Sequence, residues 1–212
     1  MKLLDLTVEE FLNEVDSKSP APGGGSVSAL VSALGCTLAR MVAHLTFGKK
    51  KYKELSDEDI EIFGKAFNEI GYDRKKLEEL VDRDTEAYNL VMDAYKLPKE
   101  TQVERDTRGQ AIENSLKMAI KTPLDICRLS EKTLKNLKYI LKYGNKNAIT
   151  DLGVSAILLY SGIEGGILNV KINLSALPNS SYKEDIIKEL NELVIASEEV
   201  KKEILEAVNQ NL

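Results

Sequence analysis

The sequence contains few of the residues from which metal sites and activated nucleophiles are usually built. Its 212 residues include one histidine and two cysteines. No Ser/His/Asp set, His-Glu-x-x-His helix or paired-cysteine metal site can be assembled from them. Cys36 and Cys127 lie in apolar helical surroundings, where reduced and buried thiols are usual, and this fits a reducing cytoplasm. His44 is better explained as a packed or surface residue than as a general base.

The chain also lacks the patterns of nucleotide-binding, nucleic-acid-binding and membrane proteins. No strand precedes its glycines as a dinucleotide fold requires, and no P-loop spacing occurs. The formal net charge is −5, with acidic and basic residues mixed, so there is no extended basic face. Residues 2–10 show no signal peptide, and the apolar stretch 27–42 is too short for a membrane span. We expect a cytoplasmic protein with no nucleic-acid or membrane partner.

Apolar residues recur at the helical three-four spacing, and no segment shows the alternation of a strand. Because 43% of the residues are apolar, the chain can bury one sizeable core. We therefore expect an all-α fold, a single-domain bundle of long helices over residues 1–212. The expected helices run from Thr7 to about Val15, Ser26 to about Thr46, Ser56 to Leu97, Thr101 to Gly144 with a kink or break at Pro123, Thr150 or Asp151 to about Leu174, and onward after Pro178.

The most informative stretch is a Pro/Gly-rich loop that runs straight into an apolar helix. It comprises Pro22, Gly23, Gly24, Gly25 and Ser26. Three glycines leave the backbone N–H groups at a helix start open to a carboxylate or another ligand anion. The alternative is a plain turn in which Ser26 caps the helix. The loop by itself names no ligand.

Asp84 interrupts the apolar stripe of the long helix. The stripe continues one turn to either side with Val81 and Tyr88, so a carboxylate at this position loses water. Desolvation favours the neutral carboxyl unless a cation or hydrogen bonds compensate, and this balance suits proton transfer near neutral pH. Asp84 is therefore the catalytic candidate. The alternative is a structural residue that pairs with an arginine or caps a neighbouring helix.

Positive charge is concentrated in the loop between the central helix and the long helix, at Lys49, Lys50 and Lys51. In a chain of net negative charge, such a local reversal can bind a polycarboxylate. A solvated charged loop is the alternative. The central helix of about 20 residues separates these lysines from the glycine loop by about 30 Å within one subunit. One ligand can reach both only if helices pair antiparallel across a dimer or the loop folds back.

Five separate blocks, in one order over essentially the whole chain, resemble the formiminotetrahydrofolate cyclodeaminase / methenyltetrahydrofolate cyclohydrolase family. Each block would be weak alone, and their order and spacing make the resemblance specific. Departures such as Tyr88, Thr150 and Ser28 remove no carboxylate and no loop glycine. The blocks are Pro22-Gly23-Gly24-Gly25-Ser26-Val27, Met41-Val42-x-x-Leu45-Thr46-x-Gly48-Lys49-Lys50-Lys51-Tyr52, Asp84-x-x-Ala87-Tyr88 with Leu97-Pro98, Gly144-Asn145-x-Asn147-x-x-x-Asp151, and Asn169-Val170-x-Ile172-Asn173.

The resemblance implies an all-helical, homodimeric folate enzyme that needs no metal or redox cofactor. It matches Asp84 to the aspartate assigned to cyclodeaminase activity, and it makes the lysines a site for the polyglutamate tail of folate. Asn145, Asn147 and Asp151 are then expected to bind substrate in the same pocket as Asp84. With no formiminotransferase domain in this sequence, the chain is expected to act alone, with its active site at or near a subunit interface.

Two reactions stay open under this resemblance. The first converts 5-formiminotetrahydrofolate to 5,10-methenyltetrahydrofolate with release of ammonia, and the second opens the methenyl ring to 10-formyltetrahydrofolate. A protein of another class, a helical dimer that binds folate without catalysis or serves as a scaffold, would show the same heptads. Such a scaffold would have no reason to keep Asp84 within an apolar stripe.

Overall fold

A computed structural model describes residues 2–212, and within them the chain forms helices and no strand. The all-α prediction is confirmed. The elements are η1 (Leu3–Asp5), α1 (Val8–Val15), α2 (Gly24–His44), α3 (Lys50–Lys53), α4 (Asp57–Lys96), α5 (Gln102–Tyr143), η2 (Lys146–Ala148), α6 (Ile149–Ser175) and α7 (Ser181–Asn209).

Side chains cap three of these helices where the sequence predicts. The Thr7 hydroxyl accepts from the Glu10 N–H at 3.2 Å, and the Glu10 carboxylate accepts from the Thr7 N–H at 2.7 Å. Ser56 caps α4, and Thr101 caps α5 with its own capping box. Each cap satisfies N–H groups that the first helical turn leaves without an acceptor.

Two predicted helix starts and one predicted break were wrong. Helix α2 begins at Gly24 with Gly23 as its N-cap, so Ser26 lies inside the first turn. Helix α6 begins at Ile149 directly after the η2 turn, and neither Thr150 nor Asp151 caps it. Helix α5 continues through Pro123 over 42 residues without a break.

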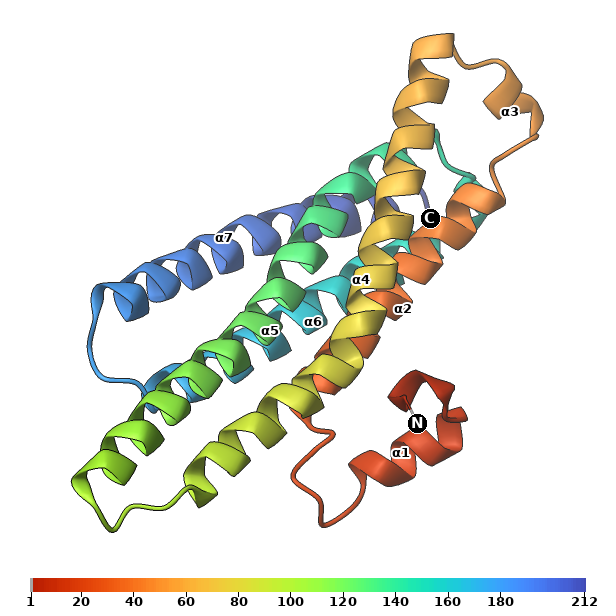
Figure 1. The fold of residues 1–212 in the computed structure, drawn as a ribbon. Helices are drawn as coiled ribbons and strands as arrows, with labels where there is room; N and C mark the ends of the chain where they lie inside the picture. The colour runs from red at the N-terminus through yellow and green to blue at the C-terminus, as the bar shows by residue number, and fades with distance from the viewer. Residues whose placement is uncertain (1) are drawn as a thin grey trace.

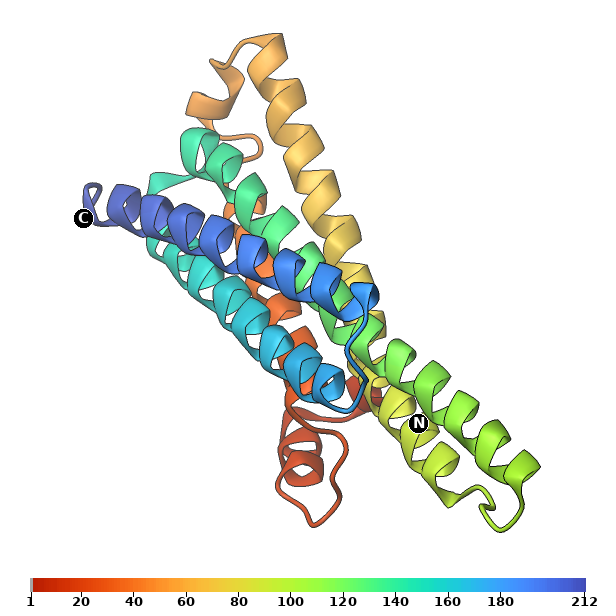
Figure 2. The same cartoon turned by 90° about the vertical axis from the view of Figure 1, so that its left-hand side faces the viewer.

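Helices α2, α4, α5 and α6 form the centre of the bundle, and α7 packs along α5 and α6 (Figures 1 and 2). Small residues let α2 and α6 lie close together. A Cβ at Gly35 would come within 3.1 Å of the Ser155 carbonyl oxygen, and one at Gly162 would lie 2.9 Å from the Ser28 carbonyl oxygen. The Ser155 hydroxyl also donates to the Gly35 carbonyl at 2.7 Å. These contacts place α2 in the middle of the protein, as its small side chains predict.

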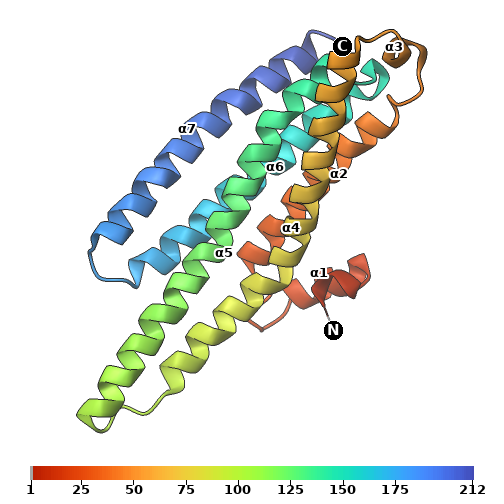
Figure 3. The ribbon, with the colours of Figure 1, turned by 45° about the horizontal axis from the view of Figure 1, so that its top comes forward.

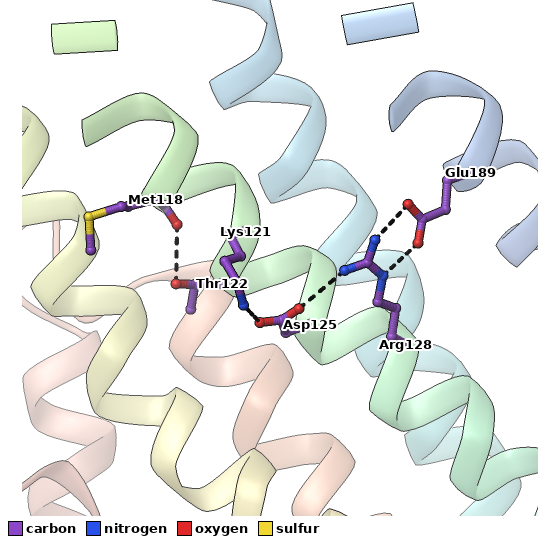
Figure 4. Close-up of polar contacts among 6 residues, drawn as sticks. All are labelled: Met118, Lys121, Thr122, Asp125, Arg128 and Glu189. Atoms are coloured by element: carbon purple, nitrogen blue, oxygen red, sulfur yellow. Dashed lines mark hydrogen bonds and ion pairs between the residues drawn. The ribbon is translucent and has the colours of Figure 1, made fainter. Parts of the chain in front are cut away.

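A polar contact attaches α7 to the outside of α5. The Arg128 guanidinium donates to both carboxylate oxygens of Glu189, from Nε at 2.6 Å and from Nη2 at 2.8 Å. Figure 4 shows this pair together with Asp125, which accepts from Arg128 at 3.4 Å and pairs with Lys121. A bidentate pair of this kind fixes orientation as well as distance. It therefore adds an oriented contact to the apolar packing of α7 on the bundle.

Two stretches are long and apolar enough to cross a membrane by length and composition, namely α2 and Lys146–Ser175. In the bundle, the most apolar 18 residues are 56% buried in α2 and 50% buried in Lys146–Ser175. Core helices of a bundle have this composition, so their burial accounts for it. The expectation that the stretch in α2 is buried is confirmed, although α2, with 21 residues, is not too short to span.

The loop before α2 and the short helix α3 lie at opposite ends of α2 (Figures 1 and 3). The described residues thus keep the glycine loop and the lysines apart within one chain, as helix length predicts. Each end of α2 carries a cavity.

Candidate active site

Asp84 reaches from α4 to the N-terminus of α2. Its Oδ2 accepts a hydrogen bond of 3.0 Å from the backbone N–H of Ser26. This N–H belongs to the first turn of α2, where the helix itself supplies no acceptor. Asp84 thus does for α2 what a capping side chain does elsewhere, and it also lines a cavity. Asp84 therefore caps the neighbouring helix α2 and also lines the cavity.

Burial raises the pKa of the Asp84 carboxyl, while the hydrogen bonds from Ser26 act in the opposite direction. The side chain is half-buried, and no cation lies among the residues that line its cavity. Without a positive partner, desolvation disfavours the charged form. A carboxyl with a raised pKa can hold and release a proton closer to neutral pH than an exposed aspartate can.

The glycine loop fits closely around this carboxylate. A Cβ at Gly25 would overlap the Asp84 carboxylate, so only glycine lets α2 approach it. A Cβ at Gly24 would lie 3.2 Å from Nδ2 of Asn169, and one at Gly23 would lie 3.2 Å from the Pro20 carbonyl. Ser26 anchors the turn through its hydroxyl, which donates to the Val81 carbonyl at 2.7 Å. Close approach therefore requires glycine at position 25, and it leaves little room for a side chain at Gly23 and Gly24.

The cavity beside Asp84 has a volume of about 290 Å³ and opens to solvent. Among its described lining residues, Asp84 is the one charged group, and the rest are apolar or neutral polar. Of the predicted loop residues, Gly23 and Gly24 line it, whereas Pro22, Gly25 and Ser26 lie behind them. The lining residues are Pro20, Ala21, Gly23, Gly24, Asp84, Ala87, Tyr88, Val91, Ala119, Asn169, Ile172 and Asn173.

Asn169 and Asn173 were missed as candidate site residues. Both lie near the end of α6 and line the cavity. Their signal in the sequence is two asparagines four apart on an otherwise apolar helix, within the last of the five blocks. This spacing places both side chains on one helix face.

The predicted lysines line a second cavity at the other end of α2, with a volume of about 480 Å³. Lys49, Lys50 and Lys51 are joined there by Lys142 and Lys146, and no acidic residue is among the described lining. Outside the lining, Lys50 pairs with exposed Glu54 at 3.8 Å and Lys142 pairs with Asp59 at 3.7 Å. Five ammonium groups around one cavity favour an anion with several charges.

Asn145 and Asn147 line the lysine cavity, and Asp151 lines neither cavity. Asn145 ties η2 to α2, since its N–H donates to the Thr46 hydroxyl at 2.8 Å and its Oδ1 accepts from the Asn147 N–H at 3.1 Å. Within one chain, the structure therefore does not bring these three residues to Asp84. Their expected place beside Asp84 would need a second subunit.

The remaining candidates lie outside the Asp84 cavity. The exposed His44 ends α2 at the lysine end and packs edge-on against Phe67, with ring centroids 4.9 Å apart. Cys36 and Cys127 are free and buried, and burial raises the pKa of each thiol to about 12. Neither thiol is an activated nucleophile.

Together, fold and site define an all-helical protein with a desolvated carboxyl in one cavity and a cluster of lysines in another. The particular family follows from sequence comparison. Residues 7–192 match the family model described as formiminotransferase-cyclodeaminase, and the chain belongs to this family.

Similar proteins carry two activities in their names. The chain is 34% identical over 206 residues to a methenyltetrahydrofolate cyclohydrolase of Methylorubrum extorquens, covering 97% of each. It is 34% identical over 182 residues to the mouse formimidoyltransferase-cyclodeaminase, covering 86% of this chain and 33% of that protein. The chain thus spans about a third of the bifunctional relative. A crystal structure of formiminotetrahydrofolate cyclodeaminase from Thermotoga maritima superimposes with a TM-score of 0.86 at 28% identity, covering 99% and 98% of the two chains.

Proposed function

We propose that this protein is a folate one-carbon enzyme that converts 5-formiminotetrahydrofolate to 5,10-methenyltetrahydrofolate and ammonia. The observation that carries the proposal is Asp84, a carboxyl of raised pKa that faces a cavity lined by no other charged residue. Family membership and the cyclodeaminase structure support the same reaction.

The reaction requires two proton movements and no oxidation. N10 attacks the amidine carbon attached to N5, the five-membered ring closes, and the departing nitrogen leaves as ammonia. One proton leaves N10 and one reaches the leaving nitrogen. Because the amidine carbon, N10 and the leaving nitrogen lie next to one another, one carboxyl can move both protons. Ionised Asp84 also stabilises the amidinium and methenyl cations in a partly dry cavity.

The N-terminus of α2 orients the carboxylate. The Ser26 N–H donates to Oδ2, and Gly25 packs against the same carboxylate, so the side chain is held where it lines the cavity. The described lining contains no lysine or arginine. A cation there would lower the pKa of Asp84, away from neutral pH, and would repel the cationic intermediates. We infer that no metal or redox cofactor takes part, since exchanging one C–N bond for another changes no oxidation state and a carboxyl can move both protons.

The second candidate reaction is hydrolysis of 5,10-methenyltetrahydrofolate to 10-formyltetrahydrofolate. The relative that the chain matches over 97% of both lengths is named for this activity. Water would add to the methenyl carbon that the first reaction forms, and Asp84 would take a proton of that water. The bond from this carbon to N5 would then break as the hydroxyl proton passes to N5, which leaves the formyl group on N10. The same cavity can serve either reaction.

We further propose that the lysine cavity binds the polyglutamate tail of the folate. The pterin and its cationic amidine suit the Asp84 cavity, and the anionic tail suits the five lysines. Because the two cavities are separated by the length of α2, about 30 Å, one folate cannot easily bridge them within a chain.

A homodimer would resolve this distance. Outward-facing apolar residues on α2 and α6 support it, since Leu34 is 49% exposed and Leu168 is 66% exposed. Val154 and Ile157 extend the same type of surface along α6. Two-fold pairing of this face with the α2 helices antiparallel would bring the Asp84 cavity of one chain toward the lysine cavity of the other.

A side-by-side spectrophotometric assay tests the function. With 5-formiminotetrahydrofolate, we expect the methenyl absorbance to appear and ammonia to be released in equal amounts. With 5,10-methenyltetrahydrofolate, faster loss of absorbance than in buffer would show the hydrolase reaction. If neither substrate reacts faster than in buffer, a folate-binding or scaffolding protein would be the correct interpretation.

A further inference from the structure

Pro123 frees a carbonyl group at the edge of the Asp84 cavity. A proline has no N–H, so the carbonyl of the residue four positions earlier loses its helical donor. In α5 this residue is Ala119, which lines the cavity. The preceding carbonyl, that of Met118, accepts a hydrogen bond of 3.3 Å from the Thr122 hydroxyl (Figure 4).

Asn173 of α6 supplies the missing donor. Its Nδ2 donates to the Ala119 carbonyl at 2.9 Å and to the Asn169 carbonyl at 3.0 Å. A side-chain amide has two hydrogens on nitrogen, so these two bonds use its full donor capacity. Because both partners are carbonyl oxygens, which only accept, the opposite orientation of the amide would place oxygen against oxygen. The orientation of the Asn173 amide is thus fixed.

Because Nδ2 of Asn173 is held by two carbonyls, its Oδ1 is left to accept from a ligand. Asn173 is half-buried and lines the cavity, and no described residue donates to its Oδ1. Asn169, one turn away, is oriented in the same way, because its Nδ2 donates to the Gly165 carbonyl at 2.8 Å. The wall formed by α6 therefore presents an oriented acceptor opposite the helix that carries Asp84.

We propose that Asn173 determines specificity in this cavity by accepting, at Oδ1, a hydrogen bond from an N–H group of the reduced pterin ring. Pro123 acts through it as a positioning residue, because it frees the Ala119 carbonyl that holds the amide. The identity of the ligand rests on the proposed function. The oriented acceptor rests on the geometry of Ala119, Pro123 and Asn173. A buried site built to accept an N–H discriminates strongly against ligands that lack one.

Equilibrium binding of 5-formyltetrahydrofolate, a stable folate with a substituent on N5, tests the proposal without turnover. Asn173→Ala is expected to raise Kd about tenfold, the usual effect of losing one hydrogen bond in a partly buried site. The matched control is Asn136→Ala on α5, which removes another half-buried asparagine bonded to a neighbouring helix, through Glu69 at 3.0 Å. This control is expected to leave Kd unchanged.

Asn173→Asp tests whether ligand binding needs the anchoring bonds of the amide nitrogen or only an oxygen acceptor at this position. Aspartate keeps an oxygen acceptor, but it replaces the nitrogen that the two carbonyls require. Kd is therefore expected to rise at least as much as for Asn173→Ala. Wild-type affinity in Asn173→Asp would overturn the anchoring argument.

Pro123→Ala completes the test, because alanine restores an N–H that competes for the Ala119 carbonyl. Alone it is expected to raise Kd about threefold, and in the Asn173→Ala background it should have no further effect. Equal effects in both backgrounds would show that Pro123 does not act through Asn173. If Asn173→Ala binds as the unmodified protein does, the inference fails alone. If the unmodified protein binds no folate, the proposed function fails and the inference with it.

Discussion

At the residue scale, Asp84 joins a structural contact with a place in the cavity. Oδ2 accepts from the Ser26 N–H and caps α2, and the carboxyl also faces the cavity. Gly25 makes this approach possible, because any side chain there would overlap the carboxylate. The backbone of the glycine loop therefore positions the carboxyl to which the proposed function assigns proton transfer.

Asp84→Asn is expected to lower kcat by about 10²-fold or more, the usual contribution of a positioned acid or base. The asparagine oxygen can still accept from Ser26, so the α2 cap and the Kd for folate should change little. Steady-state kinetics and equilibrium binding check this. Asp82→Asn is the matched control, since Asp82 accepts from the Leu3 N–H at 2.7 Å on the same helix and lies outside the cavity. Turnover of Asp84→Asn within threefold of wild type would contradict the assignment.

The raised pKa of Asp84 predicts how stability depends on pH. A carboxyl whose folded pKa lies above the unfolded value, about 3.9, releases its proton more readily in the unfolded chain. Its contribution to the free energy of unfolding is complete below the unfolded pKa and is lost as pH rises through the folded pKa. Asp84→Asn should therefore gain stability relative to wild type as pH rises from about 3.5 to 7. Chemical denaturation across this range measures the difference, and a constant difference would show that the pKa is not raised.

At the element scale, the close contact of α2 with α6 holds the two walls of the site together. Gly162 meets Ser28 and Ser32 across this contact, and Gly35 meets Leu159. Such packing excludes side chains that would push the helices apart. The register of α2 against α6 also sets the contact between Gly24 and Asn169. Nδ2 of Asn169 lies 3.2 Å from the position that a Cβ on Gly24 would take.

Gly162→Ala is expected to destabilise the protein by about 1–3 kcal/mol, because its Cβ would overlap the Ser32 hydroxyl and press on the Ser28 carbonyl. Gly64→Ala in α4 is the control, since a Cβ there meets nothing within 4 Å. Removing an unneeded glycine from a helix interior should stabilise by about 0.5–1 kcal/mol. Denaturant titration measures both changes. Equal stabilisation by both variants would contradict the close contact.

At the scale of the whole molecule, the two cavities carry opposite charge at the two ends of α2. One holds a single carboxyl, and the other holds five lysines without a described acid. A substrate with a cationic reacting group and an anionic tail matches this polarity. The distance between them makes the second subunit part of the proposed site.

Replacing Lys49, Lys50 and Lys51 with alanine is expected to raise KM for polyglutamylated folate far more than for the monoglutamate. Added salt should reproduce part of this effect with the unmodified protein, because salt screens exposed charges. Kinetics with both substrates over a salt series make the comparison. If KM rises equally for both substrates at every salt concentration, the lysines are only solvated residues of an exposed loop.

Leu34→Glu is expected to separate the proposed dimer and to lower turnover of polyglutamylated folate, because it places a charge on the outward face of α2. Ile195→Glu on α7 is the control, since Ile195 is 69% exposed on a helix outside that face. Light scattering after size exclusion gives the mass of each. A monomeric unmodified protein, or an unchanged mass for Leu34→Glu, would contradict the dimer.

The sequence by itself determined the helices and most of their starts. Capping residues and apolar spacing act within a few positions, so Thr7, Ser56 and Thr101 could be recognised without tertiary structure. The break in the apolar stripe marked Asp84 for the same reason, because burial of one helix face is a local pattern. The five blocks were sufficient to indicate the family.

Only the tertiary structure decided what these residues do together. Asp84 and Ser26 are 58 positions apart, and Asn173 and Ala119 are 54 apart, so no local pattern predicts either contact. Pro123 was expected to kink or break α5. The helix continues without a break, and a side chain of another helix bonds the freed carbonyl. The α2 start moved to Gly24 because a carboxylate from α4 replaces the local cap. Hydrogen bonds between distant segments form wherever packing brings a donor to an unpaired acceptor, and packing is a property of the whole chain.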